Sequence, residues 1–211
     1  GATGNDTAVY TPTASGAGTV AIDQDTGGTD FTITFTGLEP VDLTDMLSVT
    51  INGSANADTI ALANGTSLGS ENAIQVSGMI NGGAFAMETA FVRDVGTLTV
   101  ATVAGNDSIT INSATNAHNV ANLTLDTGTD TDSIAIAGSA TVSGTMILTT
   151  TGNIADSGAG GTLSATTLKL DSGTGVGISG AVIDTTVTTL AAQASTSGGI
   201  FITETNGLTI G

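Results

Sequence analysis

The chain has 211 residues, a formal net charge of −17 and only two fixed cations, Arg93 and Lys169. This balance excludes nucleic acid and anionic membrane surfaces as partners, because both are bound through clustered Lys and Arg. The absence of cysteine excludes disulfides and thiolate metal sites, and no apolar run is long enough to insert into a membrane.

The first part of the chain alternates polar and apolar residues in short segments, which predicts strands. GNDTAVY (4–10), TDFTITFTG (29–37) and DTIAL (58–62) fit this pattern. Pro40 and nearby acidic residues interrupt it. We therefore predict a less regular coil with a loop over residues 11–45. DTIAL (58–62) lies 49 residues before DSITI (107–111), a distance of two coils, so we expect one degenerate coil between them that contains residues 81–87.

Two series of strands share one period in the second part of the chain, with neighbouring members mostly 20 to 25 residues apart. The first series ends on apolar residues at Val100, Leu125, Leu148, Leu170, Leu190 and Ile210. The second runs through Ile111, Ile136, Ile154, Ile178 and Ile202. Short strands with one apolar face can bury it only by stacking on neighbouring coils. The shared period predicts a single domain over residues 1–211, an all-β parallel β-helix (a β-solenoid) with regular coils over 46–211. A β-sandwich is the alternative, since closely spaced short strands also fit that fold.

An aspartate recurs where a turn enters a strand, in AGNDSITIN (104–112) and again in DTDSIAIAG (130–138). One interpretation is a Ca²⁺ site with oxygen ligands from Asp107, Asp126, Asp130 and Asp132. The favoured interpretation is the corner of a coil, with each carboxylate accepting a hydrogen bond from its own backbone two residues on. No cofactor is then required, and Ca²⁺ remains optional.

Other functions have less support in the sequence. A carbohydrate-active β-helix enzyme needs a carboxylate pair in an aromatic-lined groove, but there is no Trp, and Tyr10 and His118 are the only residues of their types. An ice-binding solenoid needs the same Thr-x-Thr in every coil, and the Thr runs here are irregular. Glycans are optional partners, because five Asn-x-Ser/Thr triplets can accept them, at Asn5, Asn52, Asn64, Asn106 and Asn122.

Nearly the whole chain resembles the giant repetitive surface proteins of bacteria, of the filamentous-haemagglutinin-like and β-strand-repeat kind. VTINGSANADTIAL (49–62), TLTVATVAGNDSITIN (97–112) and LTLDTGTDTDSIAIAGSATVSG (123–144) carry the resemblance. GNDT and GNDS also look like fragments of the haemolysin-type calcium repeat, without its tandem copies. The main resemblance implies a right-handed parallel β-helix on the cell surface or outside the cell.

These observations together favour a non-enzymatic structural segment of an exported adhesin or filament protein. Both ends of the sequence read as strands in phase with the coils, with no helical or Pro-rich cap. We therefore expect the end coils to contact adjoining repeats of a longer chain or copies of the same chain.

Overall fold

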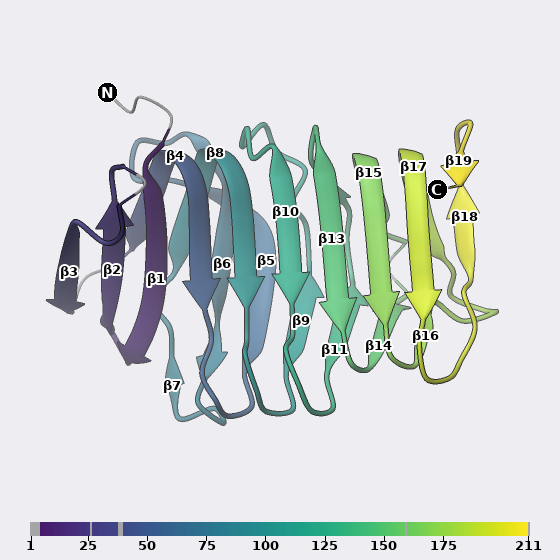
Figure 1. The fold of residues 1–211 in the computed structure, drawn as a ribbon, viewed down its shortest axis with the longest axis horizontal. Helices are drawn as coiled ribbons and strands as arrows, with labels where there is room; N and C mark the ends of the chain where they lie inside the picture. Colours follow the sequence, from purple (N-terminus) through teal and green to yellow (C-terminus); the bar gives the residue numbers. More distant parts are fainter. Residues whose placement is uncertain (1–4, 26, 38–39, 159, 211) are drawn as a thin grey trace.

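The structure is a computed structural model that describes residues 5–25, 27–37, 40–158 and 160–210. These residues form an all-β protein with no helix, and their strands join in one large mixed sheet (Figure 1). The all-β prediction is therefore confirmed. No membrane-spanning helix is found in the described ranges.

The strands follow in chain order. They are β1 (Thr7–Ala14), β2 (Ala17–Asp23), β3 (Phe31–Thr36), β4 (Val41–Asn52), β5 (Thr59–Thr66), β6 (Asn72–Ile80), β7 (Phe85–Ala86), β8 (Ala90–Ala101), β9 (Ser108–Ile111), β10 (Asn122–Asp126), β11 (Ser133–Ile136), β12 (Ala140–Thr141), β13 (Thr145–Thr150), β14 (Asn153–Asp156), β15 (Thr162–Ser172), β16 (Gly175–Val176), β17 (Ile183–Ala194), β18 (Ile202–Glu204) and β19 (Thr209–Ile210).

Two rows of parallel strands run along the molecule. Strands β4, β8, β10, β13, β15 and β17 pair in succession in the first row, and Figure 1 shows them side by side with their arrows in one direction. Strands β5, β9, β11, β14 and β16 pair in the same way in the second row. Each layer of a parallel ladder adds one strand spacing of about 4.8 Å.

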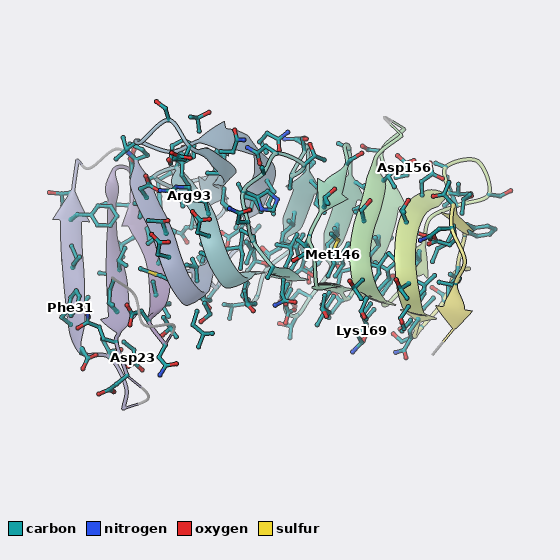
Figure 2. The ribbon with its side chains drawn as sticks, turned by 90° about the horizontal axis from the view of Figure 1, so that it is seen from above. Asp23, Phe31, Arg93, Met146, Asp156 and Lys169 are labelled. Atoms are coloured by element: carbon teal, nitrogen blue, oxygen red, sulfur yellow. The ribbon has the colours of Figure 1, made fainter. Side chains whose placement is uncertain are left out.

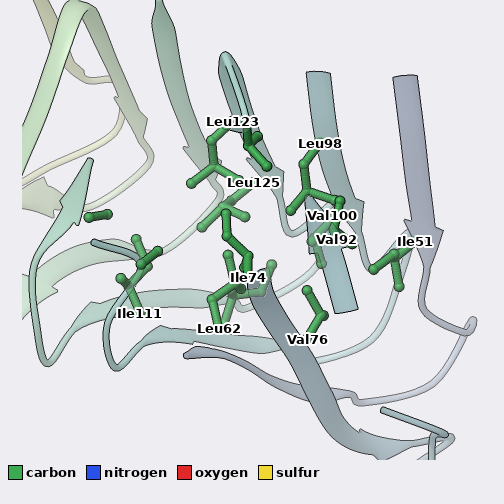
Figure 3. Close-up of a cluster of buried hydrophobic side chains, with 14 of the residues drawn as sticks. Ile51, Leu62, Ile74, Val76, Val92, Leu98, Val100, Ile111, Leu123 and Leu125 are labelled. Atoms are coloured by element: carbon green, nitrogen blue, oxygen red, sulfur yellow. The ribbon is translucent and has the colours of Figure 1, made fainter. Parts of the chain in front are cut away.

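The core lies between the two rows. Alternate residues of each strand point inward, so that Leu123 and Leu125 of β10 and Ile134 and Ile136 of β11 are fully buried. Figure 3 shows Leu98, Leu123 and Leu125 on one side of this core and Leu62 and Ile111 on the other. Burying one such side chain stabilises the fold by about 1.5–3 kcal/mol.

The first predicted column of apolar residues is correct in its first four members. Val100 pairs with Leu125, Leu125 with Leu148, and Leu148 with Leu170. The last two members are placed two residues out of register: Leu170 pairs with Ala192, whereas Leu190 pairs with Leu168 and with Ile210. Leu190 is therefore in the adjacent column, because residues i and i+2 of a strand face the same side and the apolar pattern fits either register.

The second series shows the same two-residue error. Ile111 pairs with Ile136 as predicted, but Ile154 pairs with Ile134 and then with Val176. Ile178 lies outside this column and is 61% exposed. The alternation of apolar residues within each strand was predicted correctly. Which of these residues face one another in neighbouring layers was not.

The N-terminal part of the sheet is antiparallel. β1 and β2 form a hairpin across Ser15 and Gly16, β3 pairs antiparallel with β2, and β1 joins the first parallel row by pairing with β4. Gly16 has a φ of +67°, which glycine adopts without strain. The less regular coil expected over residues 11–45 is thus mainly two antiparallel strands and the start of β4.

A second antiparallel segment lies between β5 and β8, where one degenerate coil was expected. β6 pairs antiparallel with both β5 and β8. Residues Asn81–Met87, expected inside that coil, hold the turn after β6 and the two-residue strand β7, which folds back on β6. Alternating sequence predicts a strand but not its direction, since both ladder types have the same two-residue period.

Candidate functional site: an aspartate ladder at the coil corner

Three aspartates stack at the corner that precedes the second row of strands. Asp107 Oδ1 accepts a hydrogen bond from the main-chain N–H of Asp58 at 2.7 Å, and Asp132 Oδ1 accepts one from the N–H of Asp107 at 2.9 Å. At the start of the ladder, Asp58 accepts hydrogen bonds from the N–H groups of Ser54 and Asn81. All three aspartate side chains are buried. The carboxylates of Asp107 and Asp132 therefore each bond one coil to the coil before it.

This arrangement corrects the predicted turn chemistry of Asp107 and Asp132. We expected each carboxylate to bond its own backbone two residues on, and instead each reaches the N–H of the matching aspartate in the preceding coil. Parallel stacking causes the difference, since it places that N–H within reach of the carboxylate. Ser108 and Ser133, which follow the two aspartates, pair directly across the coils, so the aspartates themselves are also neighbours. Asp126 does behave as predicted, accepting the N–H of Gly128 at 3.0 Å.

A column of buried hydroxyl groups runs beside the aspartates. The Thr102 hydroxyl donates to the Thr127 carbonyl at 3.1 Å, and the Thr127 hydroxyl lies 3.0 Å from that of Thr150 and 3.1 Å from Asp132 Oδ2. Ser172 continues the column, donating to the Gly152 carbonyl at 2.7 Å. We did not identify this column from the sequence. Its signal is present nonetheless, because a Thr or Ser follows each of Val100, Leu125, Leu148 and Leu170 by two residues.

Asp107 is the middle aspartate of the ladder. Burial raises the pKa of its carboxyl group to about 6, and the charges of Asp58 and Asp132 add to this rise. Hydrogen bonds from the Thr102 hydroxyl and the Asp58 N–H lower the pKa but do not cancel the effect of burial. Its Oδ2 atom is buried and has no hydrogen-bond partner in the described part of the chain. The carboxyl group is therefore held where its charge is disfavoured.

The four residues predicted as calcium ligands are only partly brought together. Asp107 and Asp132 are joined through the ladder, whereas Asp126 and Asp130 are exposed. Asp130 Oδ2 accepts the Gly105 N–H at 3.1 Å. Among the described residues, one group of three carboxylates has its oxygens within 4.8 Å of one another, and it is a different set: Asp23, Asp25 and Asp30, on the surface near β2 and β3. Calcium binding by the four predicted residues stays a prediction.

We expect Ca²⁺ to leave the stability of the protein unchanged. Each of the four predicted ligands already accepts a hydrogen bond from within the protein, and a bound ion would have to replace some of these bonds. A site filled at 100 times its dissociation constant would add about 2.7 kcal/mol. The measurement is the melting temperature in chelator and in millimolar Ca²⁺. A rise that grows with Ca²⁺ concentration and disappears in Asp130→Asn would instead establish the metal site.

His118, the one histidine, is a structural residue. It is 3% exposed, its Nδ1 accepts the Val120 N–H at 3.0 Å, and its Nε2 lies 3.4 Å from the Ala114 carbonyl oxygen. Burial lowers the pKa of its ring, so the neutral form is favoured. Both ring nitrogens therefore have partners within the protein.

Glu88 lines a hollow of about 400 Å³ together with Gln75, Met87 and Phe91. The Tyr10 hydroxyl donates to the Glu88 carbonyl at 3.2 Å. Burial, and secondarily the charge of Glu88, raises the pKa of Tyr10 to about 12. The phenol therefore remains protonated at neutral pH and serves as a hydrogen-bond donor in the core.

Comparison with protein-family models, with curated proteins and with solved structures finds no match for this chain. Functional inference therefore rests on its own residues. The buried polar groups of the corner bond one coil to the next.

Proposed function

We propose that this chain is a non-enzymatic structural segment of an exported cell-surface or extracellular filament protein, folded as a right-handed parallel β-helix. The observation that carries the proposal is the repeated parallel pairing from β4 to β17, with one layer added per coil. A segment built in this way gains length in proportion to its number of coils. Its role is then to extend and to present whatever is attached to it.

The corner supports the same proposal. Asp107 and Asp132 each accept a main-chain hydrogen bond from the preceding coil, and the Thr127 hydroxyl bonds the Thr150 hydroxyl of the following coil. Such bonds resist the sliding of one coil over the next, because a slip of one residue would break them and turn every apolar side chain outward. The charge of −17 adds repulsion between the sides of neighbouring molecules.

The test is removal of one whole coil. Met146 of β13 pairs with Leu168 of β15, so deletion of residues 146–167 joins Thr145 to Leu168 in the same register. We expect this shortened chain to fold, to melt cooperatively and to be about 4.8 Å shorter in small-angle X-ray scattering.

Deletion of residues 146–168 is the matched control. It removes one residue more and moves the following strands by one position, which reverses the faces of their side chains. We expect this variant to lose its cooperative transition. Equal damage from the two deletions would contradict the stacked-coil architecture on which the proposed function depends.

A further inference from the structure

Strand β3 (Phe31–Thr36) is the outermost strand at the N-terminal side of the sheet (Figure 1). Among the described residues it pairs with β2 alone. Its other edge therefore presents main-chain N–H and C=O groups that have no strand beside them. Such an edge is a template for one more strand.

The alternation of an antiparallel ladder identifies the free groups. The Gly37 N–H donates to the Gly16 carbonyl, and Phe35 and Ile33 pair with Gly18 and Val20 in the same phase. Main-chain groups of these odd-numbered residues are directed toward β2. Those of Thr32, Thr34 and Thr36 are directed away from the sheet.

The side chains of β3 add an apolar face to this edge. Phe31, labelled in Figure 2, is 44% exposed and Ile33 is 50% exposed. Both lie on the same face as Phe35, which is buried against Tyr10. The strand FTITFT contains no charge, no proline and no bulge against β2. Charges, prolines and bulges are the features that usually protect an edge strand from pairing, and β3 has none of them.

We propose that β3 pairs antiparallel with β3 of a second copy of this chain, about a two-fold axis at Ile33. In this register Ile33 lies opposite Ile33 of the second copy, and Phe31 lies opposite the second copy's Phe35. The free main-chain groups of Thr32 meet those of Thr34 across the axis. The inference rests on the proposed function and deepens it, because it names what contacts one end of the segment.

The charges near β3 favour the antiparallel arrangement. Asp23, Asp25 and Asp30 gather at the start of the strand. Antiparallel pairing carries the two acidic groups to opposite ends of the contact, whereas parallel pairing would place Asp30 beside its own copy. Pairing of β3 with the C-terminal end of the sheet in a second copy is less favourable. The strands at that end, β18 and β19, contain three and two residues, whereas β3 contains six.

The first experiment compares two lysine substitutions in the 211-residue chain by sedimentation equilibrium. We expect the unmodified chain to form a dimer and Ile33→Lys to weaken self-association at least tenfold, since two lysines would meet at the axis. Leu68→Lys is the control: Leu68 is 70% exposed in the turn after β5, and the substitution changes the charge equally. It should leave the dimer intact.

The second experiment tests the register of the two paired strands. Because the chain has no cysteine, a single introduced cysteine can form a protein–protein disulfide only with its own copy in a second chain. Ile33→Cys should form a disulfide-linked dimer with oxidised glutathione, because facing residues at a non-hydrogen-bonded position are close enough for a disulfide. Phe31→Cys should not link to itself, since in this register the two copies of residue 31 are separated by about 13 Å along the strands.

Three outcomes would overturn the inference: a monomer at all concentrations, equal loss of the dimer in both lysine variants, or growth beyond a dimer without cross-linking at residue 33. The last would indicate head-to-tail stacking. None of these outcomes affects the coil deletion, so failure of the inference is distinguishable from failure of the proposed function.

Discussion

Gly152→Ala is expected to lower the free energy of unfolding by about 3 kcal/mol. Gly152 is buried at the coil corner, and a Cβ added there would lie 1.7 Å from the main-chain oxygen of Asp132 in the preceding coil. The two coils must separate or twist to admit it, which strains the ladder on both sides. Urea unfolding followed by circular dichroism measures the loss.

The same close approach recurs in neighbouring coils. A Cβ at Gly138 would lie 1.7 Å from the Asn112 oxygen, and one at Gly173 would lie 1.8 Å from the Thr151 oxygen. Gly180→Ala is the matched control, because Gly180 is exposed and, apart from its two chain neighbours, no residue comes within 4 Å of its added Cβ. We expect the control to change stability by less than about 0.5 kcal/mol. Similar losses in the two variants would mean that the coils are not packed through their glycines.

Asp107→Asn is expected to stabilise the protein at pH 7 and to flatten its stability between pH 4 and pH 7. The pKa of Asp107 is raised from 3.8 to about 6 in the folded chain, so the folded state binds the proton more tightly than the unfolded state. Stability from this group is therefore greatest below pH 4 and is lost as the pH rises through 6. The cost at pH 7 is at most about 3 kcal/mol, from 1.36 kcal/mol for each pKa unit. Asparagine avoids it while keeping an oxygen for the Asp58 N–H.

Asp132→Asn is the contrasting variant. The hydroxyls of Thr127 and Thr151 donate to Asp132 Oδ2 at 3.1 and 2.9 Å, and its Oδ1 accepts the Asp107 N–H. An amide nitrogen cannot accept these bonds, so we expect a loss of about 1–3 kcal/mol at every pH.

Thermal or urea unfolding of the unmodified chain and both variants across pH 4–8 measures these effects. His118 contributes with the opposite sign, because its lowered pKa removes stability as the pH falls below 6.5. It is present in all three proteins and cancels in the differences. If Asp107→Asn follows the pH dependence of the unmodified chain, the Asp107 carboxyl group does not titrate in the way that its burial requires.

Most strands of the second part of the chain, and the interval at which they repeat, were predictable from the sequence. Val100, Leu125, Leu148 and Leu170 stack as their spacing predicted, because a buried apolar face recurring at a fixed interval constrains both strand and layer. The recurrence of Asp107 and Asp132 likewise indicated a coil corner. Both patterns are local and recur along the chain, and patterns of this kind can be recognised in a single sequence.

Tertiary structure alone decided register, strand direction and the partners of the corner carboxylates. Leu190 pairs with Leu168 although its spacing from Leu170 looked regular, because positions two apart on a strand are equivalent until both rows are packed. The reversal between β1 and β2 had a weak local signal, the Ser15–Gly16 turn, but alternation is the same in parallel and antiparallel strands. Asp107 bonds Asp58, 49 residues away. That contact exists only because stacking brings the two corners together, and no local pattern contains it.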